Sequence, residues 1–374
     1  MTGAFSLTAC DDTPVKAGKL TVQHVTQLIP SRVEQRESWA TDIFDIMQTL
    51  NIERNTVNVC SIIAVVDQES NFAADPVVAG LGEKSLKEIN ARLEDKLGSR
   101  LATVFRNMLK TKPSVQDNFL NRIRKVKTER QLDELYREIF DYFSKEYNVS
   151  ALTGAAKIVG SDFSERLNPI TTLGSMQVHI SYAKENKRAS MSSSELRRDL
   201  YSQYGGLYYG IHRLMTYTAN YKKPLYRFAD YNSGMYSSRN AAFQQMLAKI
   251  SGKNVELDGD LLLYAKDGDV RSEKSGTEKL VNELFSRKNI QITARQVRFD
   301  LRREKTKSFE DTDTYKTMVR LYSDKTGKRP PYAIMPEVVI SGPKLSKNYN
   351  TNWFATRVDA RYQTCMSKAK QIRL

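Results

Sequence analysis

The sequence predicts a mainly α-helical protein of the α+β class, with a small β component. Apolar residues recur at helical spacing along most of the chain up to Ser251-Gly252, and the segments beyond that point are punctuated by proline and glycine. The composition, 40% hydrophobic and 27% charged over 374 residues, is that of a globular protein. A chain of this length forms one large domain or two ordinary ones.

Two helices are expected at the start of the folded part of the chain. The apolar positions of the first are Trp39, Ile43, Ile46, Met47 and Leu50, and those of the second are Val59, Ile62, Ile63 and Val66. Both sets follow the three- and four-residue spacing of one helix face. The second helix closes at the polar pair Glu69-Ser70.

A string of amphipathic helices follows, which predicts a helical insertion over residues 83–167. Its apolar positions form four sets: Leu86, Ile89, Leu93 and Leu97; Leu101, Val104, Phe105 and Met108; Val115, Phe119, Ile123 and Val126; and Leu132, Leu135, Ile139 and Phe143. The outer faces are charged, and the segment holds no catalytic-looking cluster.

The remaining segments alternate between helix and turn signals. Asn168-Pro169 marks a turn before the β-branched segment TTLGSMQVHI. One helix is expected over residues 196–214 and another in RNAAFQQMLAKI. Residues 251–374 are predicted to form a C-terminal α/β extension, in which VELDGDLLLYAKDGD has the pattern of strands or loops.

The charge of the chain favours anionic partners. The 58 basic and 43 acidic residues give a net charge of +15, with a pI near 9.5, which suits nucleic acid, acidic lipid or cell-wall polymer. The basic clusters RIRKVKTER (122–130) and RFDLRREKTK (298–307) are interrupted by acidic and apolar residues, so they are interpreted as solvated helix faces. No nucleic-acid motif is present, and no specific nucleic-acid partner is expected.

The N-terminal segment LTAC (7–10) resembles the lipobox of bacterial lipoproteins, in which the cysteine is acylated after cleavage. The resemblance implies a signal remnant over 1–10, a lipid on Cys10, a tether over 11–35 and a periplasmic protein anchored to a membrane. The preceding MTGAFS lacks a basic n-region and is too short for a full apolar region. Either the reading frame begins further upstream or the match is accidental. No apolar stretch is long enough to span a bilayer.

Three cysteines are too few for a disulfide scaffold. If Cys10 carries lipid, Cys60 and Cys365 are an even number that could pair in an oxidising compartment. The simpler interpretation, which we favour, is that Cys60 is a small buried residue on an apolar helix.

Glu69 continues the apolar stripe that ends at Val66, so its side chain is expected to point toward the interior, while Asp67 points elsewhere. A carboxylate in that position is costly unless it is paired, protonated or used in chemistry.

Three fragments occur in order: ESNF (69–72), GSMQV (174–178) and DYNSG (230–234). Together they resemble the soluble lytic transglycosylase domain of the lysozyme superfamily. The resemblance implies a lysozyme-like domain formed by 36–82 and 168–250, a peptidoglycan substrate and no cofactor or metal. It covers less than half of the chain.

Carried over residue by residue, the resemblance makes Glu69 the general acid and base, with Ser70 supporting the local geometry. Gly174, Met176 and Gln177 would form the floor and wall of the saccharide site. Tyr231 and Asn232 would hold the catalytic carboxyl group and the N-acetyl sugar.

Most glycosidases need a second carboxylate, for which Asp75, Asp162 and Asp230 are available without a motif to support them. Lytic transglycosylases, by resemblance, need none, because the acetamido group of the substrate assists and its C6 hydroxyl attacks C1. A single catalytic glutamate therefore favours a transglycosylase. Asp230 stands where the family has alanine, and it either raises the pKa of Glu69 or faces solvent.

Several alternatives remain open. Met176 is equally suited to core packing and to a subsite floor, whereas His179 and His212 are expected to be structural and the tyrosines of YSQYGGLYYG to pack in the core. Two other functions are considered: a non-catalytic wall-binding or scaffold lipoprotein, and a basic protein that binds nucleic acid.

Overall fold

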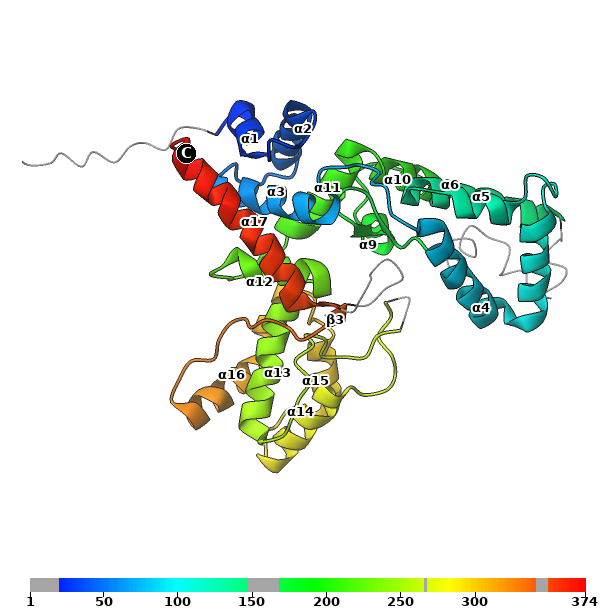
Figure 1. The fold of residues 1–374 in the computed structure, drawn as a ribbon. Coiled ribbons are helices and arrows are strands. Elements are labelled where there is room, and N and C mark those ends of the chain that lie inside the picture. Colours follow the sequence, from blue (N-terminus) through cyan, green and yellow to red (C-terminus); the bar gives the residue numbers. More distant parts are fainter. Residues whose placement is uncertain (1–19, 147–167, 266–267, 341–348) are drawn as a thin grey trace, which may run out of the picture.

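The computed structural model describes residues 20–146, 168–265, 268–340 and 349–374 (Figure 1). Within these ranges the chain is mainly helical and contains two short antiparallel β-ladders, which confirms the mainly α prediction. Figure 1 shows a central body, a lower lobe and a helical arm at the right.

The elements are distributed over these three parts as follows. The central body contains α1 (Val22–Leu28), α2 (Arg36–Thr49), α3 (Thr56–Ser70), β1 (Thr172–Leu173), β2 (Val178–His179), α9 (Ile180–Glu185), α10 (Ser193–Leu200), α11 (Gln203–Met215), α12 (Pro224–Ser233) and α17 (Thr351–Gln371). The helical arm contains α4 (Leu81–Thr111), α5 (Phe119–Lys125) and α6 (Glu129–Glu146). The lower lobe contains α13 (Ser237–Ser251), α14 (Gly276–Arg287), α15 (Ala294–Leu301), the 3-10 helix η1 (Lys307–Asp311) and α16 (Asp313–Thr326), and the ladder of β3 (Val339–Ile340) and β4 (Tyr349–Asn350) precedes α17.

Helix α3 is the centre of the first hydrophobic core. Every side chain from Val59 to Asp67 is buried, because α17 covers the face that the neighbouring helices leave open. The Cys60 and Cys365 sulfurs form a disulfide of 2.01 Å that joins α3 to α17. The interpretation of Cys60 as an unpaired core residue is therefore wrong, although the residue is fully buried.

The lower lobe has its own core, in which the rings of Phe243, Phe309 and Tyr315 pack together at centroid distances of 5.2–6.1 Å. The predicted extension 251–374 is thus divided between two cores, since α14–α16 pack in the lobe whereas α17 returns to α3. The described residues of the segment 255–269, which are 255–265, 268 and 269, form loops rather than strands, apart from one isolated bridge between Tyr264 and Val270.

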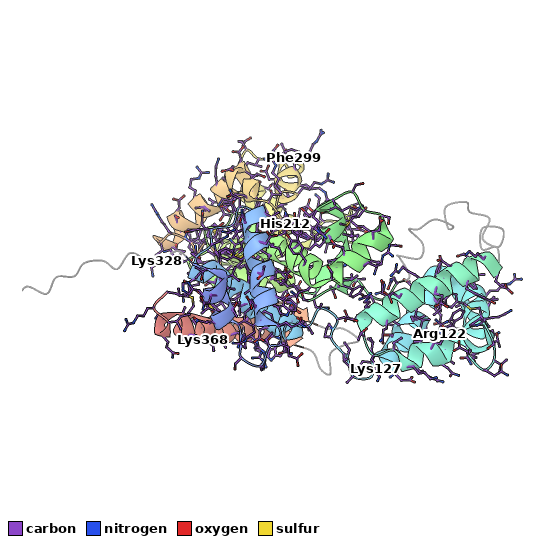
Figure 2. All side chains as sticks on the ribbon, turned by 90° about the horizontal axis from the view of Figure 1, so that it is seen from above. Arg122, Lys127, His212, Phe299, Lys328 and Lys368 are labelled. Carbon is purple, nitrogen blue, oxygen red and sulfur yellow. A yellow bond between two sulfur atoms is a disulfide. The ribbon has the colours of Figure 1, made fainter. Side chains whose placement is uncertain are left out.

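The helical arm agrees with the amphipathic pattern. The two helices predicted before residue 111 form α4, and they meet at Gly98, whose φ of 72° and ψ of 167° interrupt the helix. Arg122 and Lys127 lie on this arm, and Lys328 and Lys368 lie elsewhere on the molecule (Figure 2). Arg122 forms a bidentate pair with Glu138, as expected for a solvated helix face.

Two predicted boundaries are wrong. The tether was expected to extend to residue 35, but Leu20 begins a folded segment in which Val25 and Leu28 of α1 are buried in the core. The single helix expected over 196–214 is divided into α10 and α11, because the Ser202 hydroxyl accepts the Gly205 amide and starts a new helix. Residues 1–19, including Cys10, lie outside the described residues.

Candidate active site

Helix α3 ends at the predicted catalytic pair. Asn71 adopts a left-handed conformation (φ 52°) that ends the helix, and Phe72 also has a positive φ of 62°. The Phe72 ring packs edge-on against Trp39, with ring centroids 5.3 Å apart. This turn leaves Glu69 half-buried at the end of α3, with Ser70 buried and its hydroxyl donating to the Val66 carbonyl at 3.2 Å.

The acid that is buried on α3 is Asp67, which is only 5% exposed. Its carboxylate accepts hydrogen bonds from Arg32 and from Arg361 Nε. The prediction that Asp67, unlike Glu69, points elsewhere than the interior is therefore wrong. A periodicity argument assumes that one helix face is open to water, but α17 covers that face of α3.

The GSMQV motif forms the β1–β2 hairpin turn. Gly174 has a φ of 77°, and a Cβ there would collide with the Leu200 carbonyl. The Met176 side chain is fully buried and lies where a Cβ on Gly210 of α11 would be. The Met176 side chain thus packs in the core, and the prediction that it lines the saccharide site is wrong for the side chain. In the sequence, the glycines of α11 could have indicated that another side chain, here Met176, packs closely against this helix.

Helix α12 brings the third motif to the first two. The Tyr231 hydroxyl donates to the Met176 carbonyl at 2.6 Å. Burial raises the pKa of Tyr231, and the negative charge of Glu69 acts on it in the same direction. The charge of Glu69 thus acts on Tyr231, and Tyr231 in turn contacts Met176, although the three residues are far apart in the sequence. Asn232 follows on α12 and is half-buried.

Gln177 connects the hairpin turn to the helical arm. Its Oε1 accepts the Thr172 hydroxyl at 3.0 Å, and its Nε2 donates to Glu129 Oε2 at 3.2 Å and to the Gly174 carbonyl at 3.3 Å. Glu129 lies at the start of α6 and is 3% exposed. The arm therefore contributes a buried carboxylate beside the predicted substrate-binding amide, which sequence reasoning missed because no motif includes Glu129.

A buried ion pair fixes α6 against α10. Asp133 is fully buried and binds Arg197 Nη1 at 2.6 Å and Asn168 Nδ2 at 2.6 Å. Arg197 also donates to the Ile170 carbonyl at 3.2 Å, close to the start of β1. This network holds the arm in a defined position relative to the hairpin.

Aromatic and basic side chains surround Tyr231. Arg213 Nη2 donates to the Tyr231 carbonyl at 3.0 Å, and its guanidinium lies 5.5 Å from the ring centroids of both Tyr182 and Tyr231. The Tyr182 hydroxyl is 2.7 Å from His212 Nδ1, and burial lowers the pKa of His212. Tyr208 stacks on His212 with an interplanar angle of 27°. Half-buried aromatic rings of this kind can pack against sugar rings.

Asp230 neither faces solvent nor acts on the site as a free acid. It is fully buried, and burial raises its pKa. Its carboxylate accepts hydrogen bonds from Tyr217 Oη, Tyr221 Oη, Tyr236 N, Ser237 Oγ and Ser238 N. These bonds fix the turn from α12 into α13, so Asp230 is a structural residue.

Asp75 and Asp162 are the other two candidates for a second carboxylate. Asp75 Oδ1 accepts the Arg130 amide at 3.4 Å, at the junction with the arm. Asp162 lies outside the described residues. Within the ranges that the structure describes, no group of three His, Cys, Asp or Glu side chains could hold a metal ion, and no helix is long and apolar enough to cross a membrane.

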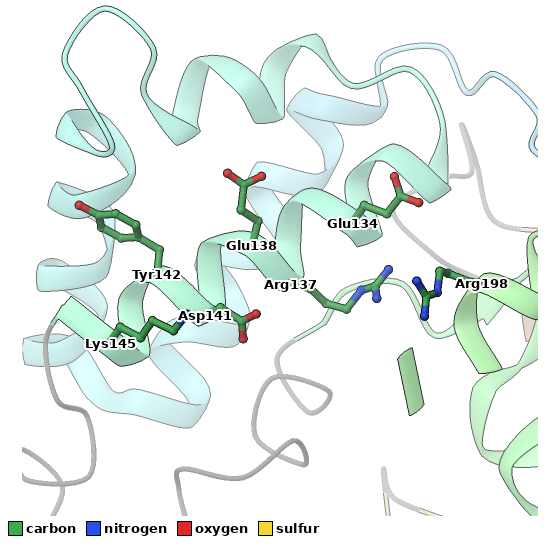
Figure 3. A pocket seen from close by; sticks show the side chains of 7 residues that line it. All are labelled: Glu134, Arg137, Glu138, Asp141, Tyr142, Lys145 and Arg198. Atoms are coloured by element: carbon green, nitrogen blue, oxygen red, sulfur yellow. The ribbon is translucent and has the colours of Figure 1, made fainter. Parts of the chain in front are cut away.

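A cavity of about 620 Å³ lies on the outer side of α6, away from these motifs (Figure 3). Figure 3 shows acidic and basic side chains interspersed around it, from Glu134 and Arg137 on α6 to Arg198 on α10. Because charges of both signs alternate along its wall, this cavity has no preference for an anionic or a cationic ligand.

Two comparisons place the chain among known sequences. The family model described as "Protein of unknown function (DUF1615)" matches residues 32–368. The uncharacterized protein YaiW of Escherichia coli (strain K12) is 33% identical over 363 residues, which cover 95% of this chain and 93% of that protein. No solved structure matches the chain. The family match includes the helical arm, both cores and most of α17.

Proposed function

The chain belongs to the DUF1615 family, whose function is unknown, and we propose that it is a lytic transglycosylase that cleaves peptidoglycan with Glu69 as its acid and base. The bond cleaved joins N-acetylmuramic acid to N-acetylglucosamine, and the product carries a 1,6-anhydro ring. The proposal includes a lysozyme-like arrangement of residues 36–82 and 168–250.

The convergence of the three motifs carries the proposal. The Tyr231 hydroxyl donates to the Met176 carbonyl at 2.6 Å, and the Glu69 charge acts on Tyr231. Chance matches of three short fragments would not be expected to meet at one point of the fold. The half-buried Glu69 is accessible to a substrate while its neighbour Ser70 is buried.

The chemistry needs one carboxyl group. Glu69, when protonated, donates its proton to the glycosidic oxygen as the C1–O bond breaks, and the substrate's acetamido oxygen bonds to C1. The Glu69 carboxylate then accepts the proton of the C6 hydroxyl, whose oxygen displaces the acetamido oxygen from C1. No water is consumed, and Glu69 ends protonated. General acid–base catalysis contributes roughly 10²–10⁴-fold to the rate.

The residues around Glu69 have supporting roles in this proposal. Tyr231 fixes the hairpin turn next to the carboxyl group, and the Gln177 amide is oriented by Thr172 and Glu129. Gly174 lets the turn pack against the Leu200 carbonyl, where a Cβ would collide, so its role in this proposal is to shape the turn. Ser70 stabilises the last turn of α3, and Asn232 is available to the N-acetyl group.

Mass spectrometry of purified sacculi digested with the full-length protein tests the proposal. We expect muropeptides that end in 1,6-anhydro-N-acetylmuramic acid. Products with only the hydrated mass would identify a muramidase instead. Binding to sacculi without any product would favour the second candidate, a non-catalytic wall-binding or scaffold lipoprotein.

We also propose that the protein is anchored in the bacterial periplasm by a lipid on Cys10. The Cys60–Cys365 disulfide supports an oxidising compartment. Labelling of cells with radioactive palmitate should mark the wild-type protein and leave a Cys10→Ser variant unlabelled. Equal labelling of both proteins, or of neither, would contradict the lipid anchor.

A further inference from the structure

A second cavity, of about 520 Å³, lies between the α1–α2 connection, α3 and α17. Asp67 lies in its wall, and Glu69 is two residues further along α3. Two residues of an α-helix correspond to a rotation of about 200°. This cavity therefore opens on the side of α3 that faces away from the candidate active site.

The wall of the cavity carries an excess of positive charge. Among the described residues that line it, Arg32, Arg361 and Lys368 are basic and Asp67 alone is acidic, so three cations face one carboxylate. Burial and the charge of nearby Arg36 lower the pKa of Lys368, in keeping with a concentration of like charges.

The buried Asp67 holds both guanidinium groups in place. Arg32 and Arg361 bind its two different carboxylate oxygens, Oδ1 and Oδ2, the latter at 3.1 Å. Hydrogen bonds within the described residues use one of the five N–H groups of Arg32 and two of those of Arg361. Most donors of the two guanidinium groups are thus available at fixed positions.

The rest of the wall is partly apolar. Leu28, Pro30 and Ile63 contribute hydrocarbon surface, and the disulfide-bonded Cys365 lies beside them. Ser31 adds a hydroxyl group that can donate to an anionic oxygen, whereas the Thr364 hydroxyl already donates to the Ala360 carbonyl at 2.9 Å. The cavity combines cationic donors with an apolar wall, as a ligand with an anionic group on an organic body requires.

We infer that this cavity binds a phosphate group, either on a soluble phosphate ester or on an anionic phospholipid headgroup. Planar guanidinium groups are suited to phosphate oxygens, and Lys368 supplies a further charge-assisted donor. The cavity lies where α1 and the C-terminal part of α17 approach each other (Figure 1), and Lys368 Nζ donates to the Ile29 carbonyl there at 3.5 Å. The inference does not depend on glycan cleavage.

The test uses the full-length protein and two phosphate sources. Isothermal titration calorimetry with glycerol phosphate measures binding of a soluble ester. Co-sedimentation with phosphatidylglycerol vesicles, compared with phosphatidylcholine vesicles, measures binding of an anionic lipid surface at a fixed salt concentration.

Two double variants separate a defined site from general electrostatic attraction. Arg32→Gln with Lys368→Gln removes two cations from the cavity and leaves the pair of Arg361 with Asp67. Arg357→Gln with Lys370→Gln removes the same charge from exposed positions of α17 outside the cavity. We expect the first variant to bind at least about tenfold more weakly and the second to stay within about twofold of wild type.

A second pair of variants removes no cation. Thr364→Glu places a negative charge at the cavity and should weaken binding, whereas Ser367→Glu places it at an exposed position of α17 outside the cavity.

The probe whose binding the cavity variants lose identifies the ligand. Loss of binding to the soluble ester identifies a site for free phosphate compounds, and loss of binding to vesicles alone identifies the lipid headgroup. Equal losses in the cavity variants and their controls, or no binding of either probe by wild type, would overturn the inference.

Discussion

The Tyr231 hydroxyl on α12 donates a 2.6 Å hydrogen bond to the Met176 carbonyl in the β1–β2 turn. These residues are 55 positions apart in the chain. The bond is buried, and it fixes the turn relative to α12. Its removal should affect both the stability of the protein and the proposed activity.

The Tyr231→Phe variant tests this bond. The buried Met176 carbonyl would lose its donor, and we expect unfolding free energy to fall by about 1–3 kcal/mol. Release of anhydro-muropeptides should fall as well, because the turn is less well positioned. Chemical denaturation and product analysis measure the two effects. Tyr362→Phe, at a buried tyrosine of α17, is the control and should leave product release unchanged.

The Glu69→Gln variant tests the catalytic assignment. The amide keeps the shape of the side chain but cannot deliver a proton, so the rate should fall by roughly 10²–10⁴-fold. We expect thermal stability to be equal or higher and binding to sacculi to persist. Glu34→Gln, an exposed substitution of the same type, should leave the rate unchanged. A destabilised Glu69→Gln protein that retains turnover would refute the assignment.

Glu129 is predicted to act through Gln177 as a positioning residue. Glu129→Gln keeps an oxygen that can accept the Gln177 Nε2 hydrogen, whereas Glu129→Leu does not. We expect kcat/KM for glycan strands to fall by about tenfold in the leucine variant, mainly through KM, and to recover in the glutamine variant. Equal kcat/KM values for the leucine variant and wild type would show that Gln177 needs no such support.

The disulfide is predicted to contribute substantially to stability. Replacing both Cys60 and Cys365 with alanine should lower the unfolding free energy by about 2–5 kcal/mol. Dithiothreitol should lower the Tm of wild type and leave the Tm of the double variant unchanged. An equal response of both proteins to the reductant would mean that the bridge does not form in solution.

The lower lobe should lose stability as pH rises. Burial raises the pKa of Glu304 from 4.5 to about 8, and its carboxyl group accepts hydrogen bonds from the Leu261 amide and the Tyr264 hydroxyl. The folded state therefore binds a proton that the unfolded state releases between pH 4.5 and about 8. The stabilisation is complete below pH 4.5 and is lost as pH rises toward 8.

Calorimetric melting as a function of pH measures this loss, with a slope of at most about 1.4 kcal/mol per pH unit. Glu304→Gln keeps the group neutral, so its melting temperature should depend less on pH in this range. A variant with the pH dependence of wild type would exclude Glu304 as the source.

The sequence predicts the features that depend on local patterns. The helix that ends at Glu69-Ser70, the turn at Gly174 and the helices of the arm follow from periodicity and turn chemistry. Asp67 and Glu129 could not be assigned in this way, because their surroundings come from α17 and from the hairpin, which are distant in the sequence. Asp230 was misassigned for another reason, because its donors come from the turns on both sides of α12, whose geometry no sequence motif specifies.

The position of α17 has a consequence for the order of folding. This helix follows every other described element in the chain, yet it covers α3, which precedes most of them. During synthesis the apolar α3 therefore lacks this cover until α17 (Thr351–Gln371) has been made. Contacts over such separations form slowly, and exposed apolar surface promotes aggregation. We therefore expect the nascent protein to need protection of α3 until α17 is available, and chains that terminate before α17 to be prone to proteolysis.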